Sequence, residues 1–546
     1  MKKIILLTIL FISLIACEDN EMEYQLLPEE ISSINLLNNP VIYEPENIAI
    51  TIENSAAKVD SVVMYLDEEI IFSKLNATNF NFQFDPEEYT TGLRNLKISV
   101  FQNGNKITNK EYPITIHRKL LEVELDEYFF RPEFEDYVLF ASAKDGSLLA
   151  VKQIDAVPLS FVLTTEVNIE EKSPYMLTIA SRFLNEAQES VIVNSVDGLT
   201  RATFKKFTPK PPKRKNLKKQ WKLNTIGFSQ DLVATGSNNS HYGTGFDGVD
   251  FSFFIIEYNI LNDVTDLENF YVTSFDRTAM AYKHMWLNKN DFTSDFVVNA
   301  DNLTSENQEE RSIDASYEDG FENGYERSLL IKGYQSQNDF DNNKYHSIWS
   351  SSYGVLQSPN MFILPNQTYT LNTSFYKYSY ILQLEDYLTI RTGTPLEQYS
   401  IPNWNLDFGI QNKNITVMSS GIGHNVGKIL ISSGNFVDEL PMVDGKMLMY
   451  SWNINFDSAN TTTVRLPELP DELEAWNFGK FLQSSTPEIK WVRLERYENI
   501  SDYDSYLQKI IKENKAPLQV SPVYEAKFKS NDEYNYFIYD EDTFFY

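Results

Sequence analysis

Cysteine and histidine are scarce in this chain, which has one cysteine and five histidines among 546 residues. A single cysteine excludes disulfides within the chain and any zinc site built from cysteines. The histidines are scattered and form no H-E-x-x-H pair of the kind that binds zinc on one helix face. We therefore expect no metal site, and nothing in the sequence indicates a cofactor.

Basic residues are also in the minority, with 47 Lys and Arg against 77 Asp and Glu and a formal net charge of −30. A compact body of this charge repels DNA, RNA and anionic lipid, so we expect no nucleic-acid partner. The high aromatic content, 14% of residues, excludes a disordered acidic chain. At about 150 residues per domain, the length predicts three or four globular domains.

Complete catalytic motifs are absent as well. The sequence has no G-x-S-x-G elbow and no phosphate-binding Walker loop. The spaced glycines of residues 421–427 lack a following strand–helix–strand pattern, so a dinucleotide site is not expected there. An acidic, glycine-punctuated stretch at residues 314–326 offers oxygen ligands for calcium but does not fit the EF-hand spacing, so calcium binding stays open.

The N-terminus carries a short apolar segment after two lysines. Residues 4–15 are apolar except for Thr8 and Ser13, and 12 residues are too few to span about 30 Å of hydrocarbon as a helix. The segment ends in Leu14-Ile15-Ala16-Cys17, which resembles the bacterial lipoprotein box. The resemblance implies a signal peptide over residues 1–17, cleavage before Cys17 and acylation of its thiol. Two or three acyl chains hold a protein stably on a membrane.

Acidic residues follow the cysteine directly, at Glu18, Asp19 and Glu21. This arrangement resembles the surface-export signal of Bacteroidota lipoproteins. The alternative interpretation is a merely polar tether over residues 18–27. We expect a lipid-anchored protein of the outer membrane that faces the cell exterior.

Residues 28–118 have the pattern of an immunoglobulin-like β-sandwich. Apolar residues alternate with polar ones at 48–52, 80–84 and 96–100, the period of half-buried strands. Asn103-Gly104 is a strong signal for a tight hairpin turn. The stretch from Tyr89 to Gly104 is similar to the late strands of bacterial Ig-like modules on surface lipoproteins, an architecture that implies no activity.

The rest of the chain is also predicted to be mainly β. We expect a second β module at residues 119–208, a basic Pro/Lys linker at 209–222, and β-rich domains at 223–378 and 379–546. The basic stretch is an expected solvated linker, or alternatively a contact for an acidic partner through Lys213, Arg214, Lys215, Lys218 and Lys219. One helix is expected at residues 502–513, where Ser501 can cap an apolar stripe.

Residues 247–254, DGVDFSFF, resemble the D-G-x-D-x-D-x-E strand motif of chitinase-like glycosidases. In that family the last acid protonates the leaving oxygen. Here Phe254 stands at that position and Ser252 replaces the preceding aspartate, so the family mechanism lacks its proton donor. We interpret the segment as a turn that leads into a buried strand.

Exposed aromatic side chains are the remaining route to a binding site. All seven tryptophans lie at or after residue 221. Most should be core, and Trp404, which has a turn-like context, is the one we expect to be exposed as a ligand or partner contact.

These features favour a non-enzymatic surface lipoprotein that acts as a binding or scaffold subunit of an outer-membrane protein complex. A surface glycan-binding protein of a polysaccharide-uptake system is the alternative and predicts a flat strip of exposed Trp and Tyr. A glycoside hydrolase is the third hypothesis and predicts two carboxylates about 5–10 Å apart in a cleft.

Overall fold

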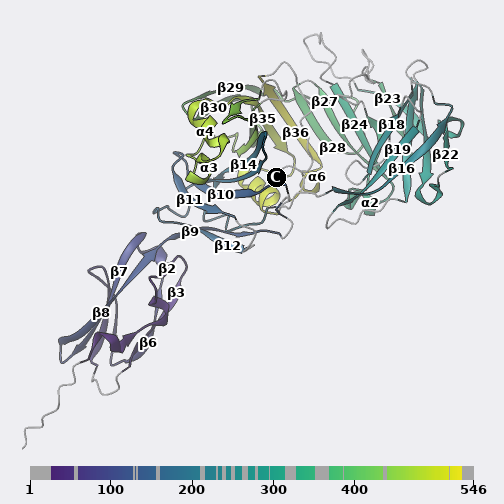
Figure 1. Cartoon of the computed structure of the whole chain (residues 1–546). Helices are drawn as coiled ribbons and strands as arrows, with labels where there is room; N and C mark the ends of the chain where they lie inside the picture. The colour runs from purple at the N-terminus through teal and green to yellow at the C-terminus, as the bar shows by residue number, and fades with distance from the viewer. Residues whose placement is uncertain are drawn as a thin grey trace, which may run out of the picture. The chain divides into compact units, whose positions relative to one another are not determined.

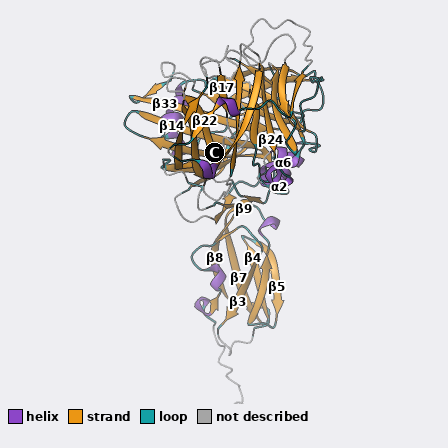
Figure 2. Ribbon diagram, turned by 90° about the vertical axis from the view of Figure 1, so that its right-hand side faces the viewer, coloured by secondary structure: helices purple, strands orange, loops and turns teal. Residues whose placement is uncertain are grey.

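The computed structural model describes most of the chain after the N-terminus. The described residues are 26–53, 59–126, 129–130, 133–154, 160–209, 215–228, 232–235, 242–247, 252–260, 268–276, 281–293, 295–313, 327–350, 368–384, 386–433, 440–513, 515 and 517–531. They form two compact units, one of Met1–Leu120 with Val162–Glu171 and one of Leu121–Phe161 with Lys172–Tyr546. Within each unit strands dominate and helices are short (Figure 2). The expected mainly β fold is confirmed.

The first unit is an immunoglobulin-like sandwich of two sheets around one core. The apolar positions at 48–52, 80–84 and 96–100 are all buried, as their alternation predicts. Asn103 and Gly104 have φ of 50° and 77° and connect two long strands, so the predicted hairpin turn is confirmed. The sheets are β1-β3-β6 (Ile31–Ser32, Glu46–Ile52, Asn79–Phe84) and β2-β8-β7-β4-β5 (Val41–Ile42, Asn105–Ile116, Gly92–Gln102, Ser61–Leu66, Glu69–Leu75).

A 13-stranded sheet is the largest element of the described part of the second unit (Figure 1). Strand β14 pairs in parallel with β33, and this pair joins residues 188–196 to residues 447–455. In sheet order the strands are β11 (Leu148–Gln153), β10 (Asp136–Ala143), β13 (Tyr175–Leu184), β14 (Gln188–Leu199), β33 (Lys446–Phe456), β31 (Val426–Ser432), β35 (Ile489–Tyr497), β36 (Val523–Ser530), β28 (Tyr387–Thr392), β27 (Lys377–Leu384), β24 (Arg327–Tyr334) and β25 (His346–Ser350), with β32 (Met442–Val443) beside β33.

Smaller sheets accompany the large one in the second unit. A three-stranded sheet, β29-β30-β34 (Asn405–Gln411, Asn414–Ser420, Thr463–Arg465), packs apolar side chains into the core formed by β14, β33 and β31. The others are β18-β19-β16-β22 (Tyr242–Asp247, Ser252–Ile260, Lys215–Ile226, Val297–Asn299), β17-β20-β21 (Leu232–Thr235, Asn269–Asp276, Ala281–Asn288) and β23-β26 (Gln308–Ser312, Thr368–Asn372). The remaining short strands are β9 (Arg118–Glu124), β12 (Ser160–Thr165) and β15 (Lys206–Phe207).

The described helices are short. They are α2 (Gln337–Asp341), α3 (Asp471–Glu474), α4 (Asn477–Ser484), α5 (Tyr503–Tyr506), a π-helical stretch at Leu507–Lys512, α6 (Pro517–Val520), and 3-10 turns at Pro28–Glu30, Ile34–Leu36, Pro86–Glu88, Lys289–Asp291 and Ala300–Asn302.

The helix expected at 502–513 is present in part, as α5 continued by the π-helical stretch. Its expected apolar stripe is buried. The cap is Asp502, whose carboxylate accepts from the Ser505 N–H at 2.7 Å, and not Ser501.

Three expected boundaries are wrong. The module expected at 119–208 is no separate body, because β10, β11, β13 and β14 belong to the large sheet. The boundary at 378/379 lies inside β27, which pairs on both sides with β24 and β28. The linker expected at 209–222 ends inside β16, which pairs with β19. In each case long-range strand pairing overrides the local signal of a composition change.

Candidate functional site

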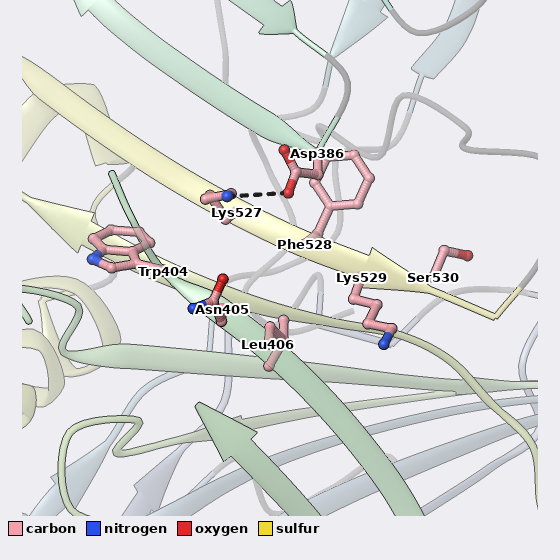
Figure 3. A pocket seen from close by; sticks show the side chains of 8 residues that line it. All are labelled: Asp386, Trp404, Asn405, Leu406, Lys527, Phe528, Lys529 and Ser530. Carbon is pink, nitrogen blue, oxygen red and sulfur yellow. Dashed lines mark ion pairs between the residues drawn. The ribbon is translucent and has the colours of Figure 1, made fainter. Parts of the chain in front are cut away.

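A pocket of about 390 Å³ lies beside the C-terminal end of β36, and we call it the β36 pocket (Figure 3). It is bounded by the end of β36, the start of β29 and the residue that precedes β28. Its lining residues are Asp386, Trp404, Asn405, Leu406, Lys527, Phe528, Lys529 and Ser530. The volume lies at the lower end of the range of about 300–1,000 Å³ that ligand pockets have.

Two ion pairs set the electrostatics of the β36 pocket. Lys527 Nζ lies 3.3 Å from Asp386 Oδ2, and Lys529 Nζ lies 2.8 Å from Asp407 Oδ1. The Lys529 hydrogen bond, with help from the Phe408 N–H, lowers the pKa of Asp407. Both carboxylates are therefore paired with a lysine, and the lowered pKa of Asp407 is the opposite of what a general acid needs at neutral pH.

Trp404 forms one end of this pocket, but it is only 3% exposed. Its indole Nε1–H donates to the Ile422 carbonyl at 2.9 Å, and the Arg496 guanidinium lies 5.7 Å from its ring centroid. Gly421 makes this closure possible, because a Cβ there would stand 2.8 Å from the indole. The expectation that Trp404 is an exposed contact is wrong, and its ring serves as a fixed wall.

The basic stretch does not form a free cationic surface where it is described. Lys218 Nζ is 2.8 Å from Glu257, a 3% exposed carboxylate that also binds Lys289 at 2.7 Å. Lys219 lies over the Trp221 ring at 4.7 Å. Lys218 thus ties β16 to β19, whereas Lys219 packs over a ring of its own strand. Lys213 and Arg214 lie outside the described residues, and of Lys215 only the strand backbone is described.

The expected anchor and export residues, Cys17, Glu18, Asp19 and Glu21, all lie outside the described part of the chain. The same is true of the acidic stretch at 314–326 and of residues 248–251 in the chitinase-like segment. Their roles stay predictions from the sequence.

Trp286 is the exposed tryptophan of the seven. It is 36% exposed, whereas the other six range from 1% to 8%. Its ring stands edge-on to Tyr271 and His346, each at 4.9 Å between centroids, and lies 5.7 Å from Phe375. Tyr376, next in the chain, is 60% exposed. The ring neighbours of Trp286 are themselves buried, so these contacts do not make a flat strip of exposed aromatics.

A cluster of buried charges lies between β31, β35 and β36. Glu495, 0% exposed, accepts hydrogen bonds from Tyr497 at 2.7 Å and Tyr524 at 3.0 Å. It also pairs with Arg493 at 2.7 Å and Lys428 at 3.2 Å. Burial lowers the pKa of Lys428 to about 8, although Glu495 opposes the shift. Glu495 at its centre is closed to solvent, so its carboxylate cannot reach an external substrate.

One serine–histidine pair has the spacing of a nucleophile and base. Ser458 Oγ lies 2.9 Å from His424 Nδ1. Both residues are buried, and burial lowers the pKa of His424. The neighbouring Asp457 carboxylate accepts from the N–H groups of Ala459 and Asn460 and so caps a turn. A buried serine without an orienting acid is not a working triad.

The described residues contain no group of three or more His, Cys, Asp or Glu side chains that could hold a metal ion. Among the same residues, no helix is long and apolar enough to cross a membrane.

Sequence reasoning missed the pocket's charged residues, Asp386, Lys527 and Lys529. Lysines alternate with Ala526 and Phe528 along β36, a pattern that indicates a half-exposed strand and no more. Only the pairing of β28 with β36 brings Asp386 to them across 140 residues of sequence.

Comparison with known proteins assigns no family. No family model matches the chain, and no curated protein sequence does. The fibronectin(III)-like modules of Clostridium thermocellum CbhA match at 14% identity over 32% of this chain and 94% of theirs, with a TM-score of 0.15. A glycosyl hydrolase family 2 member from Bacteroides cellulosilyticus matches at 8% identity over 45% of this chain and 24% of its own, with a TM-score of 0.10.

Activated alpha-2-macroglobulin of Escherichia coli matches at 9% identity over 84% of this chain and 50% of its own, with a TM-score of 0.13. The chain thus spans half or less of the hydrolase and the macroglobulin. At these TM-scores the likenesses assign no activity.

Proposed function

We propose that this chain is a non-enzymatic, lipid-anchored surface protein of the outer membrane that acts as a binding or scaffold subunit of an outer-membrane protein complex. The proposed lipid anchor rests on Cys17, and the proposed exposure at the cell surface rests on the acidic residues that follow it. The observation that carries the binding role is the β36 pocket, an open polar site on a wide sheet with its charges already paired.

Catalysis is the less favoured role, because the described groups that could act as acid, base or nucleophile are enclosed or ion-paired. Glu495 and the Ser458–His424 pair are buried, Lys428 pairs with Glu495, and the two carboxylates at the pocket are paired with lysines. A general acid or base must reach the substrate and exchange a proton with it. Ion-paired surface groups instead suit recognition of a charged partner.

Co-purification from native membranes tests this role. The tagged chain is compared with the double variant Lys527→Glu/Lys529→Glu, which reverses the charge of the pocket's lysines. The expected result is one partner protein at a fixed ratio with the parent chain and at least fivefold less with the variant. Lys480→Glu is the control, since Lys480 is 46% exposed and paired with Asp444 on another element. Equal recovery from all three proteins contradicts a role for the pocket.

Glycan binding is a second candidate, favoured by the exposure of Trp286. An indole face can stack on a sugar ring, and the neighbours of Trp286 fix its orientation. Affinity electrophoresis in gels that contain polysaccharide tests it. Trp286→Ala should abolish any retardation of the parent chain, whereas Met449→Ala, 42% exposed elsewhere, should not. An unretarded parent chain removes this candidate for the polysaccharides tried.

A further inference from the structure

Strand β29 has a free edge beside the β36 pocket. The turn residues Asn412 and Lys413 both have positive φ, 50° and 64°, the conformation of a two-residue type I′ hairpin. This turn makes Gln411 and Asn414 the first hydrogen-bonded pair of β29 and β30. In an antiparallel ladder such pairs alternate with unbonded ones. The main-chain groups of Leu406, Phe408 and Ile410 therefore point away from β30.

That outward edge lacks a strand partner in the described part of the chain. The sheet order is β29-β30-β34, with β29 at one end. The outward N–H of Phe408 donates to the Asp407 side chain at 3.0 Å. The same oxygen, Oδ1, receives Lys529 from β36 at 2.8 Å. One carboxylate thus covers the middle of the edge, the usual way in which a protein protects an exposed strand.

The protection by Asp407 is weak enough to be displaced. The Asp407 and Lys529 side chains are 58% and 47% exposed, and exposed ion pairs contribute little to stability. An incoming strand replaces each contact that it breaks, because its own carbonyl accepts the Phe408 N–H and its own carboxylate accepts Lys529. The pocket bounded by Leu406, Lys527 and Lys529 offers space for that acidic side chain (Figure 3).

We propose that β29 accepts an extended segment of a partner protein as an added strand, and that an acidic side chain of this segment takes the place of Asp407 on Lys529. The inference rests on the proposed binding function and names its partner chemistry: an extended acidic peptide. Main-chain hydrogen bonds supply affinity in this mode, and the pocket for a side chain supplies specificity.

Binding of defined peptides to the purified chain tests this inference. The probe is a fluorescent nine-residue peptide that alternates threonine and valine around a central glutamate, and the reference peptide has glutamine there. The two members of the ion pair give opposite expected results. Asp407→Ala frees the edge and Lys529 and should tighten binding of the glutamate peptide about three- to tenfold. Lys529→Ala should weaken it by a similar factor.

A matched control separates this effect from a general change in charge. The Asp444–Lys480 pair is 61% and 46% exposed, and Asp444→Ala should leave the affinity unchanged. Hydrogen exchange of the parent chain should slow in residues 405–411 when the peptide binds. No binding at millimolar peptide, equal binding of both peptides, or the same direction of change for Asp407→Ala and Lys529→Ala overturns the inference. If the membrane partner still co-purifies in that event, the proposed function stands and only the role of β29 fails.

Discussion

Glu495 is a buried charge on which the stability of the second unit depends. Its carboxylate stands between the buried cations Lys428 and Arg493. Removing one member of a buried ion network leaves the others uncompensated and costs about 3–5 kcal/mol. Glu495→Gln should lower the free energy of unfolding by that amount in urea titrations. Glu488→Gln is the control, since Glu488 is 57% exposed beside Lys490 and should change it by less than about 0.5 kcal/mol.

His346 should make the second unit sensitive to acid. Burial lowers its pKa from 6.5 to about 4, so the folded chain keeps the ring neutral while the unfolded chain binds a proton below pH 6.5. The unfolded state then holds more protons, and stability falls as the pH drops from 6.5 towards 4, by about 3 kcal/mol in total.

Thermal unfolding of the parent chain and of His346→Gln at a series of pH values checks this. The difference in stability between them should shrink as the pH falls through that window. A difference that stays constant from pH 7 to pH 4 is the contrary result.

The sequence predicted burial where a strand alternates, but not the exposure of single aromatic or charged side chains elsewhere. The alternating positions of the first unit were predicted correctly, because one buried face imposes a period of two. Trp404 was predicted wrongly, since its burial depends on Gly421 and on Arg496, which is distant in sequence. For the same reason no local pattern singled out Trp286 or the lysines of the β36 pocket.

At the level of elements, the contact of β31 with β33 depends on Gly427. A Cβ at this position would lie 2.1 Å from the Phe456 ring, which is itself fully buried. Gly427→Ala should therefore destabilise the chain by about 1–3 kcal/mol. Gly409→Ala on β29 is the matched control, since a Cβ there meets nothing within 4 Å, and it should be neutral or slightly stabilising. Equal melting temperatures for both variants would contradict this packing.

The basic stretch has the composition of a linker, but from residue 215 on it forms strand β16. Lysines at 215, 218 and 219 give β16 a charged appearance, yet Lys218 pairs with the buried Glu257 and Lys219 lies over Trp221. A lysine-rich sequence therefore indicates a solvated linker only where the fold brings no acidic or aromatic side chain to the lysines. The helix after Ser501 was predicted in part, because its apolar stripe is a local feature, whereas the cap is Asp502.

The architecture of the whole molecule was predictable only as a class. Mainly β composition and an Ig-like first unit follow from local alternation and turns. The large sheet does not follow from them. Its parallel pair β14–β33 joins segments that are about 260 residues apart in sequence, and no local pattern in either segment indicates so distant a partner.

The proposed location of the protein on the outer membrane leads to a prediction about Cys17. Cys17→Ala should abolish labelling with palmitate and release the chain from the membrane fraction, because acyl chains supply the attachment. Replacing Glu18, Asp19 and Glu21 with alanine should keep the chain in the membrane but protect it from protease added to intact cells. Membrane retention of unlabelled Cys17→Ala contradicts the anchor.

The most direct test of the proposed subunit role is the mass of the native assembly. The tagged chain is extracted from its own membranes in mild detergent, and the eluted particle is weighed and its proteins identified by mass spectrometry. We predict one particle that contains this chain, cleaved before Cys17, and an outer-membrane protein at a fixed ratio. A particle of this chain alone, under conditions that preserve other outer-membrane complexes, would contradict its role as a subunit.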